Sequence, residues 1–278
     1  MALAATPLTA AHLPNFDACA TDYDALTPIQ SQAAVQLARQ IAVHASTNQT
    51  VLPKQTLPNC WLDVGCGTGK LSAAVLAQCG KQPMASSLAK LYGVDNASAM
   101  LAQWQARCKA WLQANQLPTA VCQPSCADMA ALPFADGVMT LTFSSFALHW
   151  ADPQVLAELV RVTATGGQVH VAVPVAGSLS ALQTRFAELP IFAFLPVTKW
   201  QTALDQQVQL RGGRLLYAKT LRFCQPFDNL AALLKNLKGM GGAVQTGQHV
   251  PVATLRRYLA DTRPVKLDYN VWLAGAAV

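Results

Sequence analysis

A glycine-rich segment at residues 63–69, DVGCGTG, is the strongest chemical signal in the sequence. It lies between a predicted strand, Cys60–Val64, and a predicted helix, Lys70–Cys79. Glycines let a ligand approach the backbone, and the start of a helix offers free N–H groups with partial positive charge. The spacing is not that of a dinucleotide site, which needs glycine where Lys70 stands, nor of a phosphate loop, because Leu71 follows the lysine. A structural turn without a ligand is the alternative.

Two aspartates follow the next two predicted strands, Lys90–Val94 and Ala120–Pro124. Asp95 can accept hydrogen bonds from both hydroxyls of a ribose. Its alternative role is to cap the next helix, which we assign to Ser98 instead. Asp128 can accept a hydrogen bond from the amino group of an adenine, although aspartate is common in loops. Because ligands of open parallel sheets bind outside the carboxyl ends of the strands, these positions predict a nucleoside site.

The composition predicts a folded chain that does not span a membrane. Of 278 residues, 52% are hydrophobic and 12% are charged, which excludes a disordered polymer. No segment reaches the roughly 18 consecutive apolar residues of a membrane span. Residues 1–13 lack the basic side chain that a secretory signal needs, so we expect a cytoplasmic protein. The eight cysteines form no CxxC pair and no zinc spacing, so we expect reduced thiols and no metal.

The order of the predicted elements indicates an α/β fold. Strands and helices alternate between residues 60 and 174, which predicts a parallel sheet with helices on both faces. Residues 1–57 are predicted as an N-terminal helical lid, residues 58–176 as the core, and residues 177–278 as a helical insert plus final strands. The further predicted elements are a helix over Tyr23–Ser46, a mainly helical segment over 177–212, the strands Val138–Phe143, Gln168–Val173, Leu215–Phe223 and Lys266–Ala274, and the helices Ser98–Gln116, Pro153–Thr163, Asn229–Lys238 and Pro251–Ala260.

The glycine segment and the segments after it resemble the class I S-adenosylmethionine-dependent methyltransferases. The similarity covers residues 60–175 and rests on WLDVGCGTG at 61–69, LPF at 132–134, FSSFALHW at 143–150, ELVRV at 158–162 and the glycines at 166–167. It implies a Rossmann-like, seven-stranded, mostly parallel sheet that ends in an antiparallel hairpin. It also implies S-adenosylmethionine as the cofactor, S-adenosylhomocysteine as its product, and no metal.

Segments outside that core resemble a narrower family, the malonyl-acyl-carrier-protein O-methyltransferases. They are Phe16-x6-Tyr23-x6-Gln30, VAGSL at 175–179, LKNLKGMG at 234–241 and LDYNVW at 267–272. With the core, the resemblance covers nearly the whole chain. It implies transfer of a methyl group to the free carboxylate of a malonyl thioester, the step that starts biotin (pimeloyl) synthesis.

The resemblance also implies the residues of both sites. On the cofactor side they are Gln30, Asp63, Gly65, Cys66, Gly67, Gly69, Asp95, Asn96, Met100, Asp128, Met129 and Ser144. On the substrate side the candidates are Tyr23, His149, Trp150, Arg185, Lys235 and Lys238. The three cations are candidates because the reacting anion needs a cation to orient it, and Lys235 and Lys238 share one helix face. A carboxylate with a pKa of about 4 is ionised at neutral pH, so the reaction needs positioning rather than a general base. Tyr23 is the candidate for positioning; the alternatives are core packing for Tyr23 and an ordinary solvated face for the cations.

The charge is unevenly distributed along the chain. The formal net charge is −1 over residues 1–184 and +7 over residues 185–278. The basic C-terminal part favours an acidic protein partner, as acyl carrier protein would be, and no run of Lys and Arg suggests nucleic acid. Two alternatives remain. One is a methyltransferase of the same fold that acts on a free small molecule, such as a quinone precursor or a free carboxylic acid. The other is a cofactor-binding protein without catalytic activity.

Overall fold

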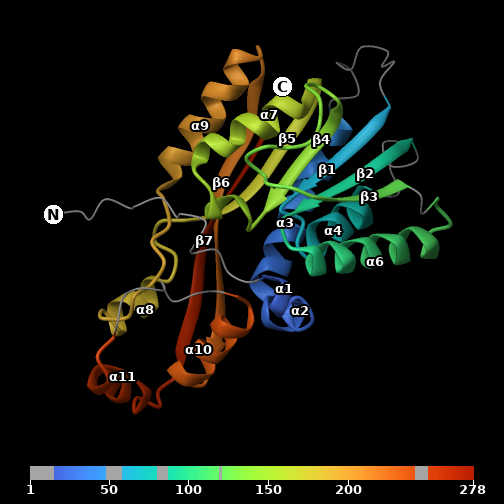
Figure 1. Cartoon of the computed structure of the whole chain (residues 1–278). Coiled ribbons are helices and arrows are strands. Elements are labelled where there is room, and N and C mark those ends of the chain that lie inside the picture. Colours follow the sequence, from blue (N-terminus) through green and yellow to red (C-terminus); the bar gives the residue numbers. More distant parts are fainter. Residues whose placement is uncertain (1–15, 48–57, 80–86, 119–120, 242–249) are drawn as a thin grey trace.

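The computed structural model describes residues 16–47, 58–79, 87–118, 121–241 and 250–278. Its centre is a seven-stranded sheet in the order β3-β2-β1-β4-β5-β7-β6 (Figure 1). Neighbouring strands are parallel except around β7, which runs antiparallel to both β5 and β6. The strands are β1 (Asn59–Val64), β2 (Leu88–Asp95), β3 (Cys122–Cys126), β4 (Met139–Ser145), β5 (Thr163–Val175), β6 (Arg214–Phe227) and β7 (Val265–Ala277). This architecture confirms the predicted Rossmann-like sheet with an antiparallel C-terminal hairpin.

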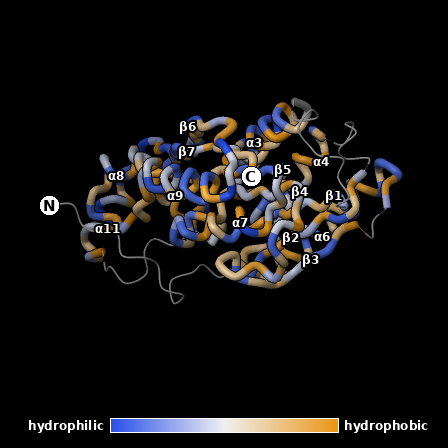
Figure 2. The backbone as a smooth tube through the Cα atoms, turned by 90° about the horizontal axis from the view of Figure 1, so that it is seen from above, coloured by the Kyte–Doolittle hydropathy of each residue, from blue (hydrophilic) through white to orange (hydrophobic). Residues whose placement is uncertain are grey.

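Helices cover both faces of the sheet (Figures 1 and 2). They are α1 (Phe16–Cys19), α2 (Tyr23–Leu26), α3 (Pro28–Thr47), α4 (Lys70–Cys79), α6 (Ser98–Ala114), α7 (Leu156–Val162), α8 (Ser180–Arg185), α9 (Val197–Leu210), α10 (Leu230–Gly239) and α11 (Val252–Leu259). Two 3₁₀ helices, η4 (Leu148–Trp150) and η5 (Pro153–Val155), follow β4. The helix predicted over Pro153–Thr163 is therefore η5 followed by α7. Among the described residues, none of the helices combines the length and apolar character needed to cross a bilayer.

Alternating side chains of the strands divide the interior into two apolar cores. Trp61 of β1 packs with α3, α4 and α6, whereas its neighbour Leu62 packs with α7 and α9. In β7, Val271 packs in the same core as Trp61, and Trp272 packs in the same core as Leu62. Both faces of the sheet are thus covered, which explains why the inner strands are apolar at most positions. The helices on the two faces hold the carboxyl ends of β1, β2 and β4 in a fixed frame.

Prolines explain why two predicted helical segments are interrupted. The helix expected over Tyr23–Ser46 is α2 and α3, because Pro28 begins a new helix and lacks the N–H that a first turn leaves unpaired. The segment 177–212 contains α8 and α9, and its middle part, with Pro190 and Pro196, is not helical. Parts of the predicted units lie outside the described residues: 1–15 and 48–57 of the N-terminal unit, 80–86 and 119–120 of the core, and 242–249 of the insert. Residue 120 also belongs to a predicted strand.

The predicted cap of α6 is wrong. Ser98 is already inside the helix, and the N-cap position is Ala97. Instead, Asp17 of α1 accepts hydrogen bonds from the backbone N–H of Ala99 at 2.7 Å and from the Ser98 hydroxyl at 3.4 Å. A side chain from the N-terminal helices therefore satisfies the start of a core helix, and α1 packs against α6.

The β6–β7 hairpin extends beyond the sheet. Residues Asn270–Ala277 pair with β5, whereas Val265–Tyr269 pair with β6 alone. The connection between the two strands carries α10 and α11, and α8 packs against β7 at the same end (Figure 1). This extension places α8 and α10, each of which buries leucine side chains, beyond the carboxyl end of β5.

Candidate active site

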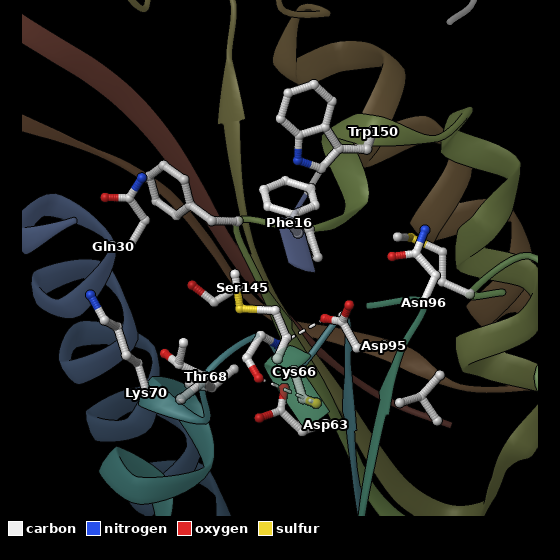
Figure 3. A pocket seen from close by; sticks show the side chains of 18 of the residues that line it. Phe16, Gln30, Asp63, Cys66, Thr68, Lys70, Asp95, Asn96, Ser145 and Trp150 are labelled. Carbon is white, nitrogen blue, oxygen red and sulfur yellow. Dashed lines mark hydrogen bonds between the residues drawn. The ribbon is translucent and has the colours of Figure 1, made fainter. Parts of the chain in front are cut away.

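A cavity of about 420 Å³ opens at the carboxyl ends of β1, β2 and β4 (Figure 3). This is where open parallel sheets bind ligands, and the volume lies in the range of small-molecule sites. The predicted cofactor residues line it, except Gly69 and Ser144. Further lining residues come from the N-terminal helices, from α4 and from the segment after β4: Phe16, Tyr23, Lys70, Ser145, Phe146 and Trp150.

All three glycines of the 63–69 segment have left-handed backbones, and Gly65 and Gly67 differ in what surrounds them. At Gly65, φ is +63°, and an added Cβ would lie 2.2 Å from the Cβ of Ala147. Gly65 thus allows close contact with the segment after β4. At Gly67, φ is +50°, and an added Cβ would meet no protein atom within 4 Å. Because Gly67 lines the cavity, its backbone is open to a ligand there.

Asp95, at the end of β2, holds the glycine segment and faces the cavity. Its Oδ2 accepts the Gly67 N–H at 2.8 Å, and its Oδ1 accepts the Ala97 N–H at 3.0 Å. Burial raises the pKa of Asp95 above its usual value, although these hydrogen bonds lower it. Each oxygen of a carboxylate can accept a second hydrogen bond, so Asp95 can still bind ligand hydroxyls.

Asp63 supports the site from below. Its Oδ2 accepts the Ser72 hydroxyl at 2.6 Å and the Ser72 N–H at 3.2 Å, and the indole of Trp104 donates to the Ser72 oxygen at 2.9 Å. Burial raises the pKa of Asp63 to about 7 despite these bonds. An added Cβ at Gly69 would lie 3.1 Å from Trp104. Gly69 therefore packs on this network and does not line the cavity.

The two serines at the end of β4 have different roles. The sequence pattern predicted Ser144 at the cofactor site, but Ser145 lines the cavity. Ser144 is fully buried, and its hydroxyl donates to the Val64 carbonyl at 2.8 Å, away from the cavity. Ser145 lines the cavity instead, and its buried hydroxyl has no hydrogen-bond partner among the described residues. Successive strand residues face opposite sides, so a shift of one position moves the polar group to the other face.

The segment after β3 forms the opposite wall. Asp128 is exposed at the rim, where its Oδ1 accepts the Ala130 N–H at 2.9 Å, and Met129 lies beside it. Asn96 and the buried Met100 approach from the end of β2 and the start of α6. This wall combines polar groups with two thioethers, as an adenosine with its polar edge and apolar faces requires.

Asp24 of α2 connects the N-terminal helices to the core, a feature that the sequence pattern missed. It accepts the Thr68 hydroxyl at 2.6 Å and pairs with Lys70 and Arg107. Burial alone would raise the pKa of Asp24, but the hydrogen bonds from Thr68 and Arg107 keep it below its usual value. Lys70 also donates to the Thr27 carbonyl at 2.9 Å, and burial lowers its pKa to about 8.

A second, smaller cavity of about 80 Å³ adjoins the first. Both are lined by Phe16, Tyr23, Gln30, Phe146 and Trp150. The second cavity is otherwise almost entirely apolar, and its other lining residues are His149, Leu179, Leu182, Leu189, Pro190, Ile191, Phe192, Phe194, Leu234, Leu237, Met240 and Tyr269. A ligand in the first cavity can therefore meet a second molecule across a boundary that Tyr23 and Gln30 help to form.

The three predicted substrate cations lie outside both cavities. Arg185 pairs with Asp261 at 2.6 Å and donates to the Pro264 carbonyl at 2.7 Å, which ties α8 to the segment before β7. Lys235 and Lys238 are exposed on α10, a helix that lines the second cavity with its other face. Their positions fit contact with a partner at the surface better than contact with a small group inside.

The first cavity fits S-adenosylmethionine. The carboxylates of Asp95 and Asp128 and the Ser145 hydroxyl, which has no partner among the described residues, supply polar contacts that a nucleoside needs, and glycine at position 67 leaves space beside them. Lys70 adds a cation and Gln30 a neutral amide at the end nearest the N-terminal helices (Figure 3). Within the described ranges, no group of three or more His, Cys, Asp or Glu side chains could hold a metal ion.

The fold is shared with solved methyltransferase-like structures. A Bacillus halodurans C-125 protein, classed as a candidate methyltransferase, superposes with a TM-score of 0.53 at 17% identity, over 87% of this chain and 97% of that one. The family profile of the methyltransferase domain matches residues 62–171, the stretch from the glycine segment into β5.

Similarity to named relatives extends well beyond that domain. The malonyl-[acyl-carrier protein] O-methyltransferase of Alcanivorax borkumensis is 34% identical over 245 residues, which cover 84% of this chain and 77% of the relative. The protein of the same name from Herminiimonas arsenicoxydans is 31% identical over 235 residues, with the same two coverages. At this identity and coverage, with the cofactor cavity intact, the chain belongs to the malonyl-[acyl-carrier protein] O-methyltransferase family.

Proposed function

We propose that this chain transfers a methyl group from S-adenosylmethionine to the free carboxylate of malonyl-acyl carrier protein, giving the methyl ester that starts biotin synthesis. The similarity to relatives named for this reaction, over 84% of the chain, carries the proposal. The adjoining cavities support it, because one suits the cofactor and the other suits an apolar acyl arm. The proposed location is the cytoplasm, where the eight free cysteines stay reduced.

The residues at the boundary of the two cavities would orient the acceptor and exclude water. Bound S-adenosylmethionine supplies an electrophilic methyl group on a sulfonium centre. Burial raises the pKa of Tyr23 well above its usual value, so its phenol stays protonated and can donate a hydrogen bond to the carboxylate. Gln30 offers a neutral amide at the same boundary, and Phe16 packs edge-on against Trp150 with ring centroids 5.9 Å apart.

Neutral donors suit this reaction. The acceptor is negatively charged before methyl transfer and neutral afterwards, so tight pairing with a cation would stabilise the ground state more than the transition state. Of the described residues that line both cavities, none is a cation. Since the carboxylate is already ionised at neutral pH, no side chain has to remove a proton.

In this proposal residues 1–57 act as a lid over the core, residues 58–176, and the insert, residues 177–278, shapes the acceptor cavity. The lid assignment rests on α1, α2 and the start of α3, whose side chains line both cavities. The ion pairs and hydrogen bonds of Asp24 hold these helices against the glycine segment and α6.

We expect Asp24→Ala to release the lid and speed dissociation of S-adenosylmethionine about tenfold. Loss of a charged acceptor from partly exposed partners is worth about 1.5 kcal/mol, at the lower end for hydrogen bonds to charged groups. Stopped-flow measurement of cofactor release checks this. Asp22→Ala is the matched control, because Asp22 is exposed at the start of the same helix and makes no capping hydrogen bond. Equal release rates for the two variants would contradict the lid.

The proposed carrier protein is acidic and docks beside α10. Residues 185–278 carry a formal charge of +7, and Lys235 and Lys238 are exposed on the helix whose other face lines the acceptor cavity. A carrier bound there would need only its flexible arm to reach the interior. Charge complementarity of this kind chiefly raises the rate of encounter.

We expect Lys235→Glu with Lys238→Glu to raise KM for malonyl-carrier protein much more than KM for malonyl-coenzyme A. The preference of the wild type for the carrier should also shrink as salt rises, because the Debye length is only about 8 Å at 0.15 M. Steady-state kinetics at several salt concentrations check both effects. The control is Lys199→Glu with Arg214→Glu, two exposed cations outside α10. An equal loss with both substrates would instead place the lysines in contact with the arm or the malonyl group.

A labelling experiment tests the proposed function directly. Wild-type protein is incubated with methyl-labelled S-adenosylmethionine and malonyl-carrier protein, and we expect base-labile label on the carrier because a methyl ester is hydrolysed by base. Acetyl-carrier protein, which has no free carboxylate, is the control and should stay unlabelled. Label on a free dicarboxylic acid but not on the carrier would favour an enzyme that acts on small molecules.

A further inference from the structure

His149 is the polar side chain at the centre of the aromatic part of the second cavity. Its ring centroid lies 4.6 Å from that of Trp150, 5.6 Å from Phe194, 5.9 Å from Phe192 and 6.4 Å from Phe146. The ring is surrounded by protein yet keeps some accessible surface because it borders the cavity. Its buried Nδ1 has no hydrogen-bond partner among the described residues. A buried polar group without a partner is costly, which points to a ligand that supplies one.

The surroundings of His149 keep the ring neutral. Burial lowers its pKa to about 3, so at neutral pH the imidazole has one N–H donor and one acceptor nitrogen. Besides His149, the titratable groups among the described lining residues are Tyr23 and Tyr269, and burial raises the pKa of both phenols well above the usual value. No charged side chain of the described chain lines this cavity.

We infer that His149 binds the thioester carbonyl of the malonyl group, donating a hydrogen bond to its oxygen from the imidazole N–H. The inference rests on the proposed function and deepens it, because it makes His149 the residue that selects an acid with a carbonyl group two bonds from its carboxylate. The reacting carboxylate lies at the boundary of the two cavities, near Tyr23 and Gln30, which line both. The malonyl group is short, so its thioester carbonyl lies two bonds further in. His149 lines that part of the second cavity and lies in the sequence between the boundary residues Phe146 and Trp150.

The lining of the second cavity determines which end of the malonyl group, the carboxylate or the thioester, binds there. An ionised carboxylate is expensive to bury without a cation, and the described lining of the second cavity offers none. A thioester carbonyl is polar but uncharged and needs a single donor. Its sulfur and the following methylenes suit apolar contacts with Leu234, Leu237 and Met240 of the α10 segment. The malonyl group therefore enters with its carboxylate toward the cofactor and its thioester toward His149.

The test compares two acceptors that differ only at the carbonyl. One is malonyl-carrier protein, and the other is carrier protein whose arm bears an S-(2-carboxyethyl) group, in which CH₂ replaces the thioester carbonyl. We expect His149→Phe to lower kcat/KM for the malonyl acceptor about 10- to 100-fold, as loss of the only partner of a buried polar group predicts, and to leave the carbonyl-free acceptor within about twofold. His149→Gln, which retains an N–H donor, should restore most of the preference for the carbonyl.

Two further measurements separate this role from a structural one. The melting temperature of His149→Phe should not fall, because the substitution removes a buried nitrogen that has no partner among the described residues. Its calorimetric affinity for S-adenosylmethionine should be unchanged, since the ring lines only the acceptor cavity. The ratio of the wild-type kcat/KM values for the two acceptors should stay constant between pH 6 and 8, because the imidazole does not titrate there, whereas Asp63 and Lys70 line the cofactor cavity and would affect both acceptors alike. A ratio that changed in this range would contradict the neutral imidazole donor. His149→Phe with the wild-type preference, or with equal loss on both acceptors, would overturn the inference. A wild type that labels no malonyl-carrier protein would overturn the proposed function, and the inference with it.

Discussion

Gly67→Val is expected to abolish binding of S-adenosylmethionine while the protein stays folded. The new side chain would meet no protein atom at its Cβ, so it would project into the cofactor cavity rather than into the core. Occupied ligand space and a displaced backbone together cost about 3 kcal/mol or more, which is a loss of more than about 100-fold in affinity. Calorimetric titration with S-adenosylmethionine or S-adenosylhomocysteine measures the effect.

Gly212→Val is the matched control for that substitution. Gly212 has φ of +72°, and an added Cβ there would also meet nothing within 4 Å, but the residue lies between α9 and β6, outside both cavities. Both variants bear the same left-handed strain, about 1–2 kcal/mol for a residue other than glycine. We expect them to melt at similar temperatures and only Gly67→Val to lose the cofactor. Normal cofactor binding by Gly67→Val would show that the glycine segment is a structural turn and not part of the binding site.

Asp95→Ala should weaken cofactor binding by about 100-fold or more. Two ligand hydroxyls would lose a charged acceptor, and hydrogen bonds to charged groups are worth about 1.5–3 kcal/mol each. The substitution also frees the N–H groups of Gly67 and Ala97, so the glycine segment loses a support at the same time. Isothermal titration gives the affinity, and thermal unfolding shows whether the fold has been kept.

Asp128→Ala distinguishes the roles of the two carboxylates. Asp128 is exposed at the rim of the same cavity, where water screens and replaces its contacts, so its loss should weaken binding about tenfold at most. Asp95→Asn should fall between the two alanine variants, since an amide retains one acceptor oxygen. If Asp95→Ala had the same cofactor affinity and melting temperature as the wild type, Asp95 would not be part of the binding site.

The core of the fold was predictable because its signals are local. The strand, the glycine segment and the start of α4 are continuous in the sequence, β2 ends at Asp95, β4 ends at Ser145, and Asp128 comes two residues after β3. Parallel pairing then brings those strand ends to one edge. The choice between Ser144 and Ser145 was not predictable in the same way. A strand covered on both faces is apolar at both phases, so the sequence does not reveal which face meets the cavity.

The lid contacts and the second cavity depend on residues far apart in the chain. Asp24 meets Thr68 and Arg107 across 44 and 83 positions, and no periodic pattern marks such a pair. The sequence marks Lys70 only by its position, where a dinucleotide site has glycine. The structure shows that this lysine contacts the N-terminal helices. The positive charge of Arg185 did not predict its role, because the side chain pairs with Asp261 rather than facing either cavity.

Because of the extended β6–β7 hairpin, the two cavities are lined largely by different parts of the chain. Outside the shared boundary, most residues that line the second cavity come from 177–278, on or beside α8, α10 and β7 and in the segment before α9, whereas the residues that line the first cavity come from 16–151. Evolution can therefore exchange the acceptor while inheriting the methyl-donor machinery unchanged. Insertions between β6 and β7 leave the register of β1, β2 and β4 untouched, so new substrate specificities can arise there without refolding the half of the chain that lines the cofactor cavity.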